Sequence, residues 1–203
     1  MISVLLIGGG GHCRSCIDVV EASGQYRVHG IVIPREADQS PVLGYPVAGS
    51  DEDLPALLRE CPNALVAIGQ IKSAEIRMHV YGVLKSYNAS LPVIVSAHAH
   101  VSRHAEIGEG SIVMHGAVVN AAARVAENCI INSHALIEHD ARIESHCHIS
   151  TGVLLNGGVI VGSGSFVGSG AVVREGIEIG HGAVIGAGQI VLSNVPAGTV
   201  LRS

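Results

Sequence analysis

Aliphatic residues in the second half of the chain recur at every sixth position. The series runs from Val95 to Val191 without a slip and contains seventeen positions. Four residues after each of them lies a second column of mostly small residues, from Ala99 to Val195. Helices repeat every 3.6 residues and flat strands every 2, so neither explains this pattern. A fixed short period is typical of a solenoid, in which each coil buries its apolar column by stacking on the next.

The first half of the chain alternates short apolar runs with helix-like patterns. The runs predicted as strands are residues 2–7, 27–33 and 64–68. The predicted helices are residues 13–22, which Gly24 closes, residues 50–60, with a capping box from Ser50 to Asp53, and a third that Ser73 caps and that ends near Ser86. Alternating units of this size favour a small Rossmann-like parallel sheet with helices on both faces. We therefore expect an α/β domain over residues 1–94 and a solenoid domain over residues 95–203.

The composition agrees with a narrow solenoid. Aromatic residues make up 2% of the chain and glycines number 26 of 203. A thin prism has no room for rings, and its corners need residues that adopt a positive φ. Hydrophobic residues reach 48%, which together with a net charge of −5 excludes a disordered chain.

Charge and hydropathy narrow the class of partner. The isoelectric point of about 6.1 gives no basic footprint, so we expect no nucleic-acid partner. No run of about 18 apolar residues occurs, so we expect no membrane span. Five cysteines without disulfide-like spacing and an N-terminus without a basic leader predict a cytoplasmic protein.

One coil of the predicted solenoid, residues 131–148, is unusually polar. His139 comes two residues after the inward-facing Ile137, which places it at an outward corner. The same corner is Gly157 one coil later and Ala121 one coil earlier. Because stacked coils lie about 4.8 Å apart, His139 would project between two positions with almost no side chain. A thin ligand could enter such a slot.

The residues around His139 suit acyl transfer. Transfer to an amine or hydroxyl needs a base with a pKa near neutrality, and histidine is the natural choice. Asp140 or Glu138 can fix its tautomer, and the backbone N–H of Gly157 can face a developing oxyanion. The alternative is an ordinary solvated corner, since the chain has 12 histidines.

The hexads over residues 95–195 resemble the hexapeptide repeat of left-handed parallel β-helix acyltransferases. In that family three hexads form one triangular coil, with the aliphatic and small residues pointing inward. The resemblance implies a left-handed parallel β-helix for the C-terminal domain. A prism with flat sides, and one active coil with too few groups to enclose coenzyme A, predict a homotrimer with sites at its interfaces.

A narrower resemblance covers nearly the whole chain. Asn132, the run from Glu138 to Asp140, His148 and the glycine-rich turn at residues 8–12 are similar to the sialic acid O-acetyltransferase family in its broad sense. That family includes acetyl-CoA-dependent N-acetyltransferases that act on nucleotide-linked 4-amino sugars in bacterial glycan synthesis. The resemblance implies an acetyltransferase of this kind, with acetyl-CoA as co-substrate and no metal.

The resemblance also implies roles for individual residues. The expected catalytic residues are His139 as general base, Asp140 as its partner and Asn132, which helps to order the pair. The expected cofactor contacts are His148, near the thioester, and Gly157, Ser169 and Ala187, along the pantetheine and nucleotide path between subunits. The expected contacts to the nucleotide of the sugar substrate are Gly10, Gly11 and His12, with Gly69 beside them.

The glycine-rich turn has a physical basis for binding a phosphate, because a strand-to-helix turn offers free N–H groups and a positive helix end. It does not match a dinucleotide fingerprint, since Cys13 replaces the last glycine and no acidic residue closes the second strand. We therefore expect no NAD site. The solenoid half contains no lysine, which leaves open how the adenine end of coenzyme A is held.

Other functions remain open at this point. The acceptor could be a hydroxyl, as in sialic acid O-acetylation, and the sequence fixes neither the sugar nor its nucleotide. The pair His134 and His139, together with His98, resembles the zinc ligands of the gamma-type carbonic anhydrases and suggests a zinc hydro-lyase. In one chain His98 and His134 are two coils apart, about 9.6 Å, so such a site would have to lie between subunits. Cys13 and Cys16 supply at most half a zinc site, and a non-catalytic structural protein is the third alternative.

Overall fold

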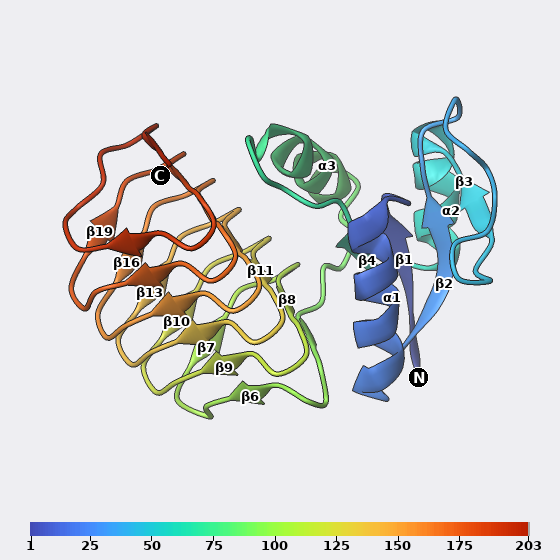
Figure 1. Cartoon of the computed structure of the whole chain (residues 1–203). Coiled ribbons are helices and arrows are strands. Elements are labelled where there is room, and N and C mark those ends of the chain that lie inside the picture. The colour runs from blue at the N-terminus through green and yellow to red at the C-terminus, as the bar shows by residue number, and fades with distance from the viewer. Residues whose placement is uncertain (203) are drawn as a thin grey trace.

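The computed structural model describes residues 1–202 and contains two parts (Figure 1). The N-terminal part is a four-stranded sheet with three helices, and the C-terminal part is a stack of short strands. In chain order the N-terminal elements are β1 (Ile2–Ile7), α1 (Gly11–Ser23), β2 (Tyr26–Val32), β3 (Val47–Gly49), the 3₁₀ helix η1 (Asp51–Asp53), α2 (Leu54–Glu60), β4 (Ala64–Val66) and α3 (Glu75–Ser86). The small parallel sheet predicted from the sequence is therefore confirmed.

The sheet has the order β3-β2-β1-β4, with every pair parallel. The end of α1 follows the sequence closely, because Gly24 adopts a φ of 65° that suits glycine. The carboxylate of Asp53 accepts the backbone N–H of Ser50 at 2.8 Å, as the expected capping box requires. The edge strand β3 was not predicted, since three residues are too few to show an alternation.

The C-terminal strands form three faces of a left-handed parallel β-helix. The first face contains β5 (Ile94–Val95), β8 (Ile112–Val113), β11 (Ile130–Ile131), β14 (His148–Ile149), β17 (Phe166–Val167), β20 (Val184–Ile185) and β22 (Val200–Leu201). The second face contains β6 (His100–Val101), β9 (Val118–Val119), β12 (Leu136–Ile137), β15 (Leu154–Leu155), β18 (Val172–Val173) and β21 (Ile190–Val191). The third face contains β7 (Glu106–Ile107), β10 (Arg124–Val125), β13 (Arg142–Ile143), β16 (Ile160–Val161) and β19 (Glu178–Ile179).

Each two-residue strand points its second residue into the prism and its first residue outward. The inward residues of the three faces and the small column between them form one continuous buried cluster. Ile131, Ile137 and Ile143, one from each face, belong to this cluster and are at most 2% exposed. The structure thus confirms the core that the period of six predicted.

The last coil departs from the register. Val195 was expected in the small column, but it pairs with Ile179, sixteen residues earlier, and so occupies the aliphatic column. The contraction removes a backbone acceptor, and the side-chain oxygen of Asn194 replaces it by accepting the N–H of Glu178 at 3.0 Å. The six-residue pattern ends at Val191 because this side chain allows a shorter turn.

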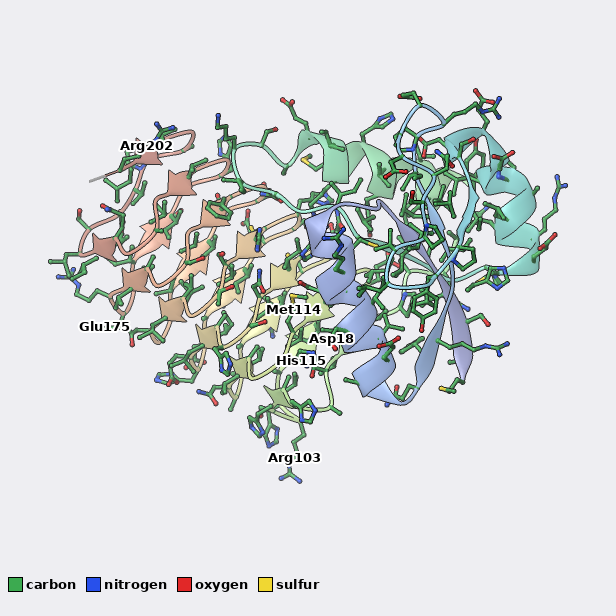
Figure 2. The ribbon with its side chains drawn as sticks, turned by 45° about the vertical axis from the view of Figure 1, so that its right-hand side comes forward. Asp18, Arg103, Met114, His115, Glu175 and Arg202 are labelled. Atoms are coloured by element: carbon green, nitrogen blue, oxygen red, sulfur yellow. The ribbon has the colours of Figure 1, made fainter. Side chains whose placement is uncertain are left out.

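The first face of the β-helix packs against the N-terminal part. Outward residues of β5, β8 and β11 share a buried cluster with α1 residues such as Ile17 and Val20. Figure 1 shows β8 and β11 on the side that faces the sheet. Near the start of this contact, His115 and Asp18 approach to 2.9 Å, and Figure 2 shows Asp18 on α1 beside His115 and Met114.

Arg77 of α3 ties the two parts together from a fully buried position. Its guanidinium donates to the carbonyl oxygens of Val66 and Ile68 at 3.0 and 2.6 Å. It also donates to the backbone and side-chain oxygens of Asn128 on the β-helix at 3.0 and 2.8 Å. No carboxylate among residues 1–202 pairs with it, and burial lowers its pKa to about 10. Arg77 therefore stays charged at neutral pH and joins β4, α3 and the β-helix.

The cysteines are all buried as free thiols. Burial raises the pKa of Cys13 to about 11 and that of Cys16 to about 12. Both side chains belong to the core around α1. Within residues 1–202, no helix has the length and apolar character needed to cross a membrane.

Candidate active site

His139 and Asp140 form an exposed pair at the corner between the second and third faces. The imidazole Nδ1 and the Asp140 carboxylate are 2.8 Å apart, and both side chains are about two-thirds exposed, at 66% and 68%. Asp140 has a φ of 61°, which turns the chain at this corner. Figure 2 labels Arg103 and Glu175, which occupy the position of His139 two coils earlier and later. The pair lies where the hexad register placed it.

Gly157 provides the floor beneath the imidazole. A Cβ atom added at Gly157 would lie 2.7 Å from Cε1 and 2.8 Å from Nε2 of His139. No side chain larger than glycine fits there without moving the ring. The absence of a side chain at this position, noted from the sequence, is therefore a packing requirement of the His139 ring.

The surroundings of His139 favour a basic imidazole. The hydrogen bond to Asp140 raises the pKa of His139 above its ordinary value, and the charges of Asp140 and Glu138 add to this. Glu138 also accepts the backbone N–H of His139 at 3.1 Å. Since Nδ1 carries the proton shared with the carboxylate, Nε2 of the neutral ring is left as the acceptor for a substrate proton.

His148 lies away from this pair, on the first face, and is only 7% exposed. Its Nδ1 donates to the backbone carbonyl of Gln70 at 2.7 Å. Its Nε2 accepts the side-chain amide of Asn132 at 3.1 Å, while the Asn132 oxygen accepts the N–H of Ser133. Burial lowers the pKa of His148 to about 4, so the ring is neutral. Within one chain, Asn132 thus contacts His148 and not the His139 pair.

The glycine-rich turn faces the same region from the N-terminal part. Gly10 caps α1 in an extended conformation, and a Cβ at Gly10 or Gly11 would meet no atom within 4 Å. The first N–H groups of a helix have no partner within it, so this open turn can receive a phosphate. His12 lies next to Gly69, where an added Cβ would be 3.3 Å from the Cβ of His12.

His12 also connects this turn to the β-helix. Its ring centroid is 6.2 Å from that of His148. Burial, together with the charges of Arg77 and His148, lowers the pKa of His12 to about 3. Its Nε2 is buried and has no hydrogen-bond partner among residues 1–202. The Oε1 atom of Gln70 is likewise buried without a partner there. The structure therefore brings His12 close to both Gly69 and His148, and His148 in turn contacts the carbonyl group of Gln70.

Ser169 and Ala187 lie at the corner between the first and second faces. They line a groove of about 430 Å³ together with Phe166 and residues of the loop after β4. Gly157 does not line this groove, because it lies at the other edge of the second face. In one chain the expected cofactor contacts therefore fall into two separate groups.

Two residues of the junction were not found from the sequence. Gln70, which directly follows Gly69, is 3% exposed and donates to the carbonyl oxygens of Gly164 and Ser165 at 3.0 and 3.3 Å. Arg77 lies within the helix predicted between Ser73 and Ser86, and the prediction assigns it no role. An arginine on the buried side of an amphipathic helix was the only available signal, and it does not say which carbonyl groups it reaches.

The metal alternatives find no ligand set in one chain. Among residues 1–202, no three His, Cys, Asp or Glu side chains are grouped so that they could hold an ion. A Cβ atom added at Gly116 would lie 2.5 Å from the His134 ring, so that ring covers Gly116 on the corner between the first and second faces. His98 instead packs near His115, with ring centroids 5.7 Å apart.

Comparison with known proteins covers both parts of the chain. Residues 3–84 match the family described as the PglD N-terminal domain. No curated protein gives a significant match in a sequence comparison.

Similar solved structures span nearly the whole chain. A mutant of perosamine N-acetyltransferase from Caulobacter crescentus, solved with CoA and GDP-perosamine, is 36% identical with a TM-score of 0.88. The match covers 96% of this chain and 90% of that one. The acetyltransferase domain of PglB from Neisseria gonorrhoeae, solved with acetyl coenzyme A, is 32% identical with a TM-score of 0.86, over 97% and 93% of the two chains.

A third structure, WeeI from Acinetobacter baumannii, is 19% identical with a TM-score of 0.74 over 98% and 95% of the two chains, and it supports the fold alone. Identity above 30% over whole chains, together with the PglD-type N-terminal domain and the hexapeptide β-helix, decides the family. The chain belongs to the hexapeptide-repeat acyltransferases, in the group of sugar acetyltransferases that carry this N-terminal domain.

Proposed function

We propose that the chain is an acetyl-CoA-dependent N-acetyltransferase that acts on the 4-amino group of a nucleotide-linked sugar in glycan biosynthesis. The observation that carries this proposal is the exposed His139–Asp140 pair over Gly157, in a chain that matches perosamine N-acetyltransferase and the acetyltransferase domain of PglB along its length. Both of those structures contain coenzyme A or acetyl-CoA, and one also contains GDP-perosamine.

In this proposal His139 is the general base. The sugar amine attacks the thioester carbonyl carbon, and Nε2 of His139 takes a proton from the amine nitrogen. Asp140, hydrogen-bonded to Nδ1 at 2.8 Å, stabilises the imidazolium that forms. A C–N bond forms, the C–S bond breaks, and coenzyme A leaves as the thiol after the imidazolium returns the proton.

The thioester oxygen becomes negative as the tetrahedral intermediate forms. Gly157 lies beneath the His139 ring, and its backbone N–H has no acceptor among residues 1–202, which makes this N–H our candidate donor to the oxygen. His148 is neutral, and Gln70 and Asn132 occupy both of its ring nitrogens, so in this chain it brings no charge to the site.

The nucleotide of the sugar would bind at the turn before α1. Gly10 and Gly11 leave the N-terminus of α1 open, and His12 and Gly69 line its edge. A diphosphate there would receive the free N–H groups of the helix. This assignment rests on the physical character of the turn and on the match of residues 3–84 to the PglD N-terminal domain.

We further propose that the active molecule is a homotrimer. Apart from His100 of β6, the outward residues of the second face are aliphatic, and Leu154 and Ile190 remain 38% and 68% exposed. His139 and Gly157 lie at one edge of this face, whereas Ser169 and Ala187 lie at the other. A threefold assembly that buries the second face puts the His139 edge of one chain beside the Ser169 edge of the next. Each site then takes its base from one chain and its cofactor groove from the neighbour.

We place this reaction in the cytoplasm. Five free, buried thiols suit a reducing compartment, and acetyl-CoA is the co-substrate of the proposed reaction.

A thiol-release assay tests the proposed activity. The protein would be incubated with acetyl-CoA and a panel of nucleotide-linked amino sugars, their free sugars, and sialic acid. We expect coenzyme A release with a nucleotide-linked amino sugar and an amide in the product by mass spectrometry. Release only with sialic acid would favour O-acetylation, and no release with any acceptor would contradict the proposal.

A further inference from the structure

The groove beside Ser169 and Ala187 contains two cations and no carboxylate. Both Lys72, from the loop between β4 and α3, and Arg202, directly after β22, line the groove. The remaining lining residues are apolar, small or uncharged. By contrast, the grooves on the third face contain the acidic residues Glu144 and Glu178.

Both cations are available to a ligand. Lys72 and Arg202 are exposed, and neither forms an ion pair with any residue in the described part of the chain. Several other surface cations are paired, as Lys85 is with Glu109. In a chain with a net charge of −5, two unpaired cations in one groove make a local site for an anion.

The loop that carries Lys72 is anchored to the β-helix. Gln70 donates to the carbonyl oxygens of Gly164 and Ser165, and its own carbonyl accepts from His148. These bonds hold the loop across the first face two residues before Lys72. The lysine is therefore presented to the groove from the N-terminal domain, although the β-helix itself contains no lysine.

We propose that Lys72 and Arg202 bind the phosphates of coenzyme A. This inference rests on the proposed function, in which Ser169 and Ala187 line the pantetheine path. In coenzyme A the diphosphate follows the pantetheine directly, so a cofactor that passes Ser169 and Ala187 in this groove carries its phosphates to the two cations. Arginine matches phosphate with two parallel hydrogen bonds, and lysine supplies a mobile point charge.

Calorimetric titration of the full-length protein with coenzyme A and with pantetheine tests this inference. The variants are Lys72→Ala, Arg202→Ala and the control Arg103→Ala. Arg103 is an exposed cation of the first coil, at the opposite end of the β-helix from Arg202 (Figure 2). Lys72→Arg keeps the charge and serves as the conservative variant.

We expect Lys72→Ala and Arg202→Ala each to weaken coenzyme A binding by about tenfold, the usual effect of one charge-assisted hydrogen bond. Pantetheine has no diphosphate and no 3′-phosphate, so its affinity should stay unchanged in every variant. Lys72→Arg should bind coenzyme A nearly as well as the wild type, and Arg103→Ala should match it.

Two results would overturn the inference while leaving the proposed function in place. The first is unchanged coenzyme A affinity in both alanine variants, and the second is an equal loss for coenzyme A and pantetheine, which would show a general disturbance of the groove. If the wild-type protein binds no coenzyme A at all, the proposed function itself fails, and this inference fails with it.

Discussion

The two nitrogens of His139 have separate environments. Nδ1 is committed to Asp140, and Nε2 lies above Gly157, where a Cβ would be 2.8 Å away. The ring faces solvent and supports no core contact. Its removal should therefore affect the reaction and leave the fold unchanged.

His139→Ala should lower kcat by about 10²–10⁴-fold, the usual cost of removing a general base. Steady-state kinetics with acetyl-CoA and the acceptor would measure the loss, and calorimetry should show unchanged coenzyme A binding. His104→Ala, an exposed histidine of the same corner two coils earlier, is the matched control and should keep full activity. Wild-type turnover in His139→Ala would disprove the assignment of the base.

Asp140→Asn should move the pH dependence. Asp140 raises the pKa of His139, and the base is active only when deprotonated, so kcat/KM should increase with pH through that pKa. Without the carboxylate the pKa falls, and the acid limb should shift to lower pH. The plateau should also be lower, because the imidazolium loses its partner. An unshifted limb would show that another group titrates.

Arg77 and Leu84 are the buried side chains of helix α3, and Arg77 is the one that reaches both parts of the molecule. Arg77 reaches β4 on one side and Asn128 on the other, and Asn128 in turn donates to His146 at 2.9 Å. The position and period of α3 could be predicted from the sequence, because Ser73 and the apolar spacing are local signals. The partners of Arg77 could not be predicted. They are backbone carbonyl groups 9 to 51 residues away, and every residue has such a group whatever its side chain.

Arg77→Met should destabilise the protein by about 3 kcal/mol, because it leaves several buried carbonyl oxygens without donors. Denaturant unfolding measured by circular dichroism would give the change. Arg59→Met, at an exposed position of α2, is the control and should stay within about 0.5 kcal/mol of the wild type. Equal midpoints for the two variants would show that the Arg77 bonds add nothing to stability.

The β-helix was predictable across most of its length, and the assembly of a site was not. A period of six depends only on the chain itself, so the hexads gave the core, the faces and the corner of His139. The prediction for the final coil was wrong because one side chain, that of Asn194, replaces a backbone acceptor. The separation of the His139 edge from the Ser169 edge follows from the three faces. The way in which neighbouring chains meet depends on contacts between chains, which the repeat within one chain does not specify.

Mixed trimers test whether each site is shared. His139→Ala and Ser169→Trp chains would be co-expressed, the first without the base and the second with a blocked groove. Each variant alone should be inactive, whereas random mixing should restore about a quarter of the sites, since a site takes one group from each neighbour. Activity no higher than that of the separate variants would place the whole site within one chain.

The burial of His12, His148 and His146 beside the Arg77 guanidinium has a consequence for how the protein responds to acid. Burial and the guanidinium charge lower the pKa of all three, to about 3 for His12 and about 4 for His148. Of these four histidines, only His139, exposed and bonded to Asp140, has a raised pKa, so it is the one expected to exchange a proton on the acid side of the activity profile. The logarithm of kcat/KM should therefore fall with a slope of one on the acid side, about tenfold per pH unit, as expected for a single-proton response.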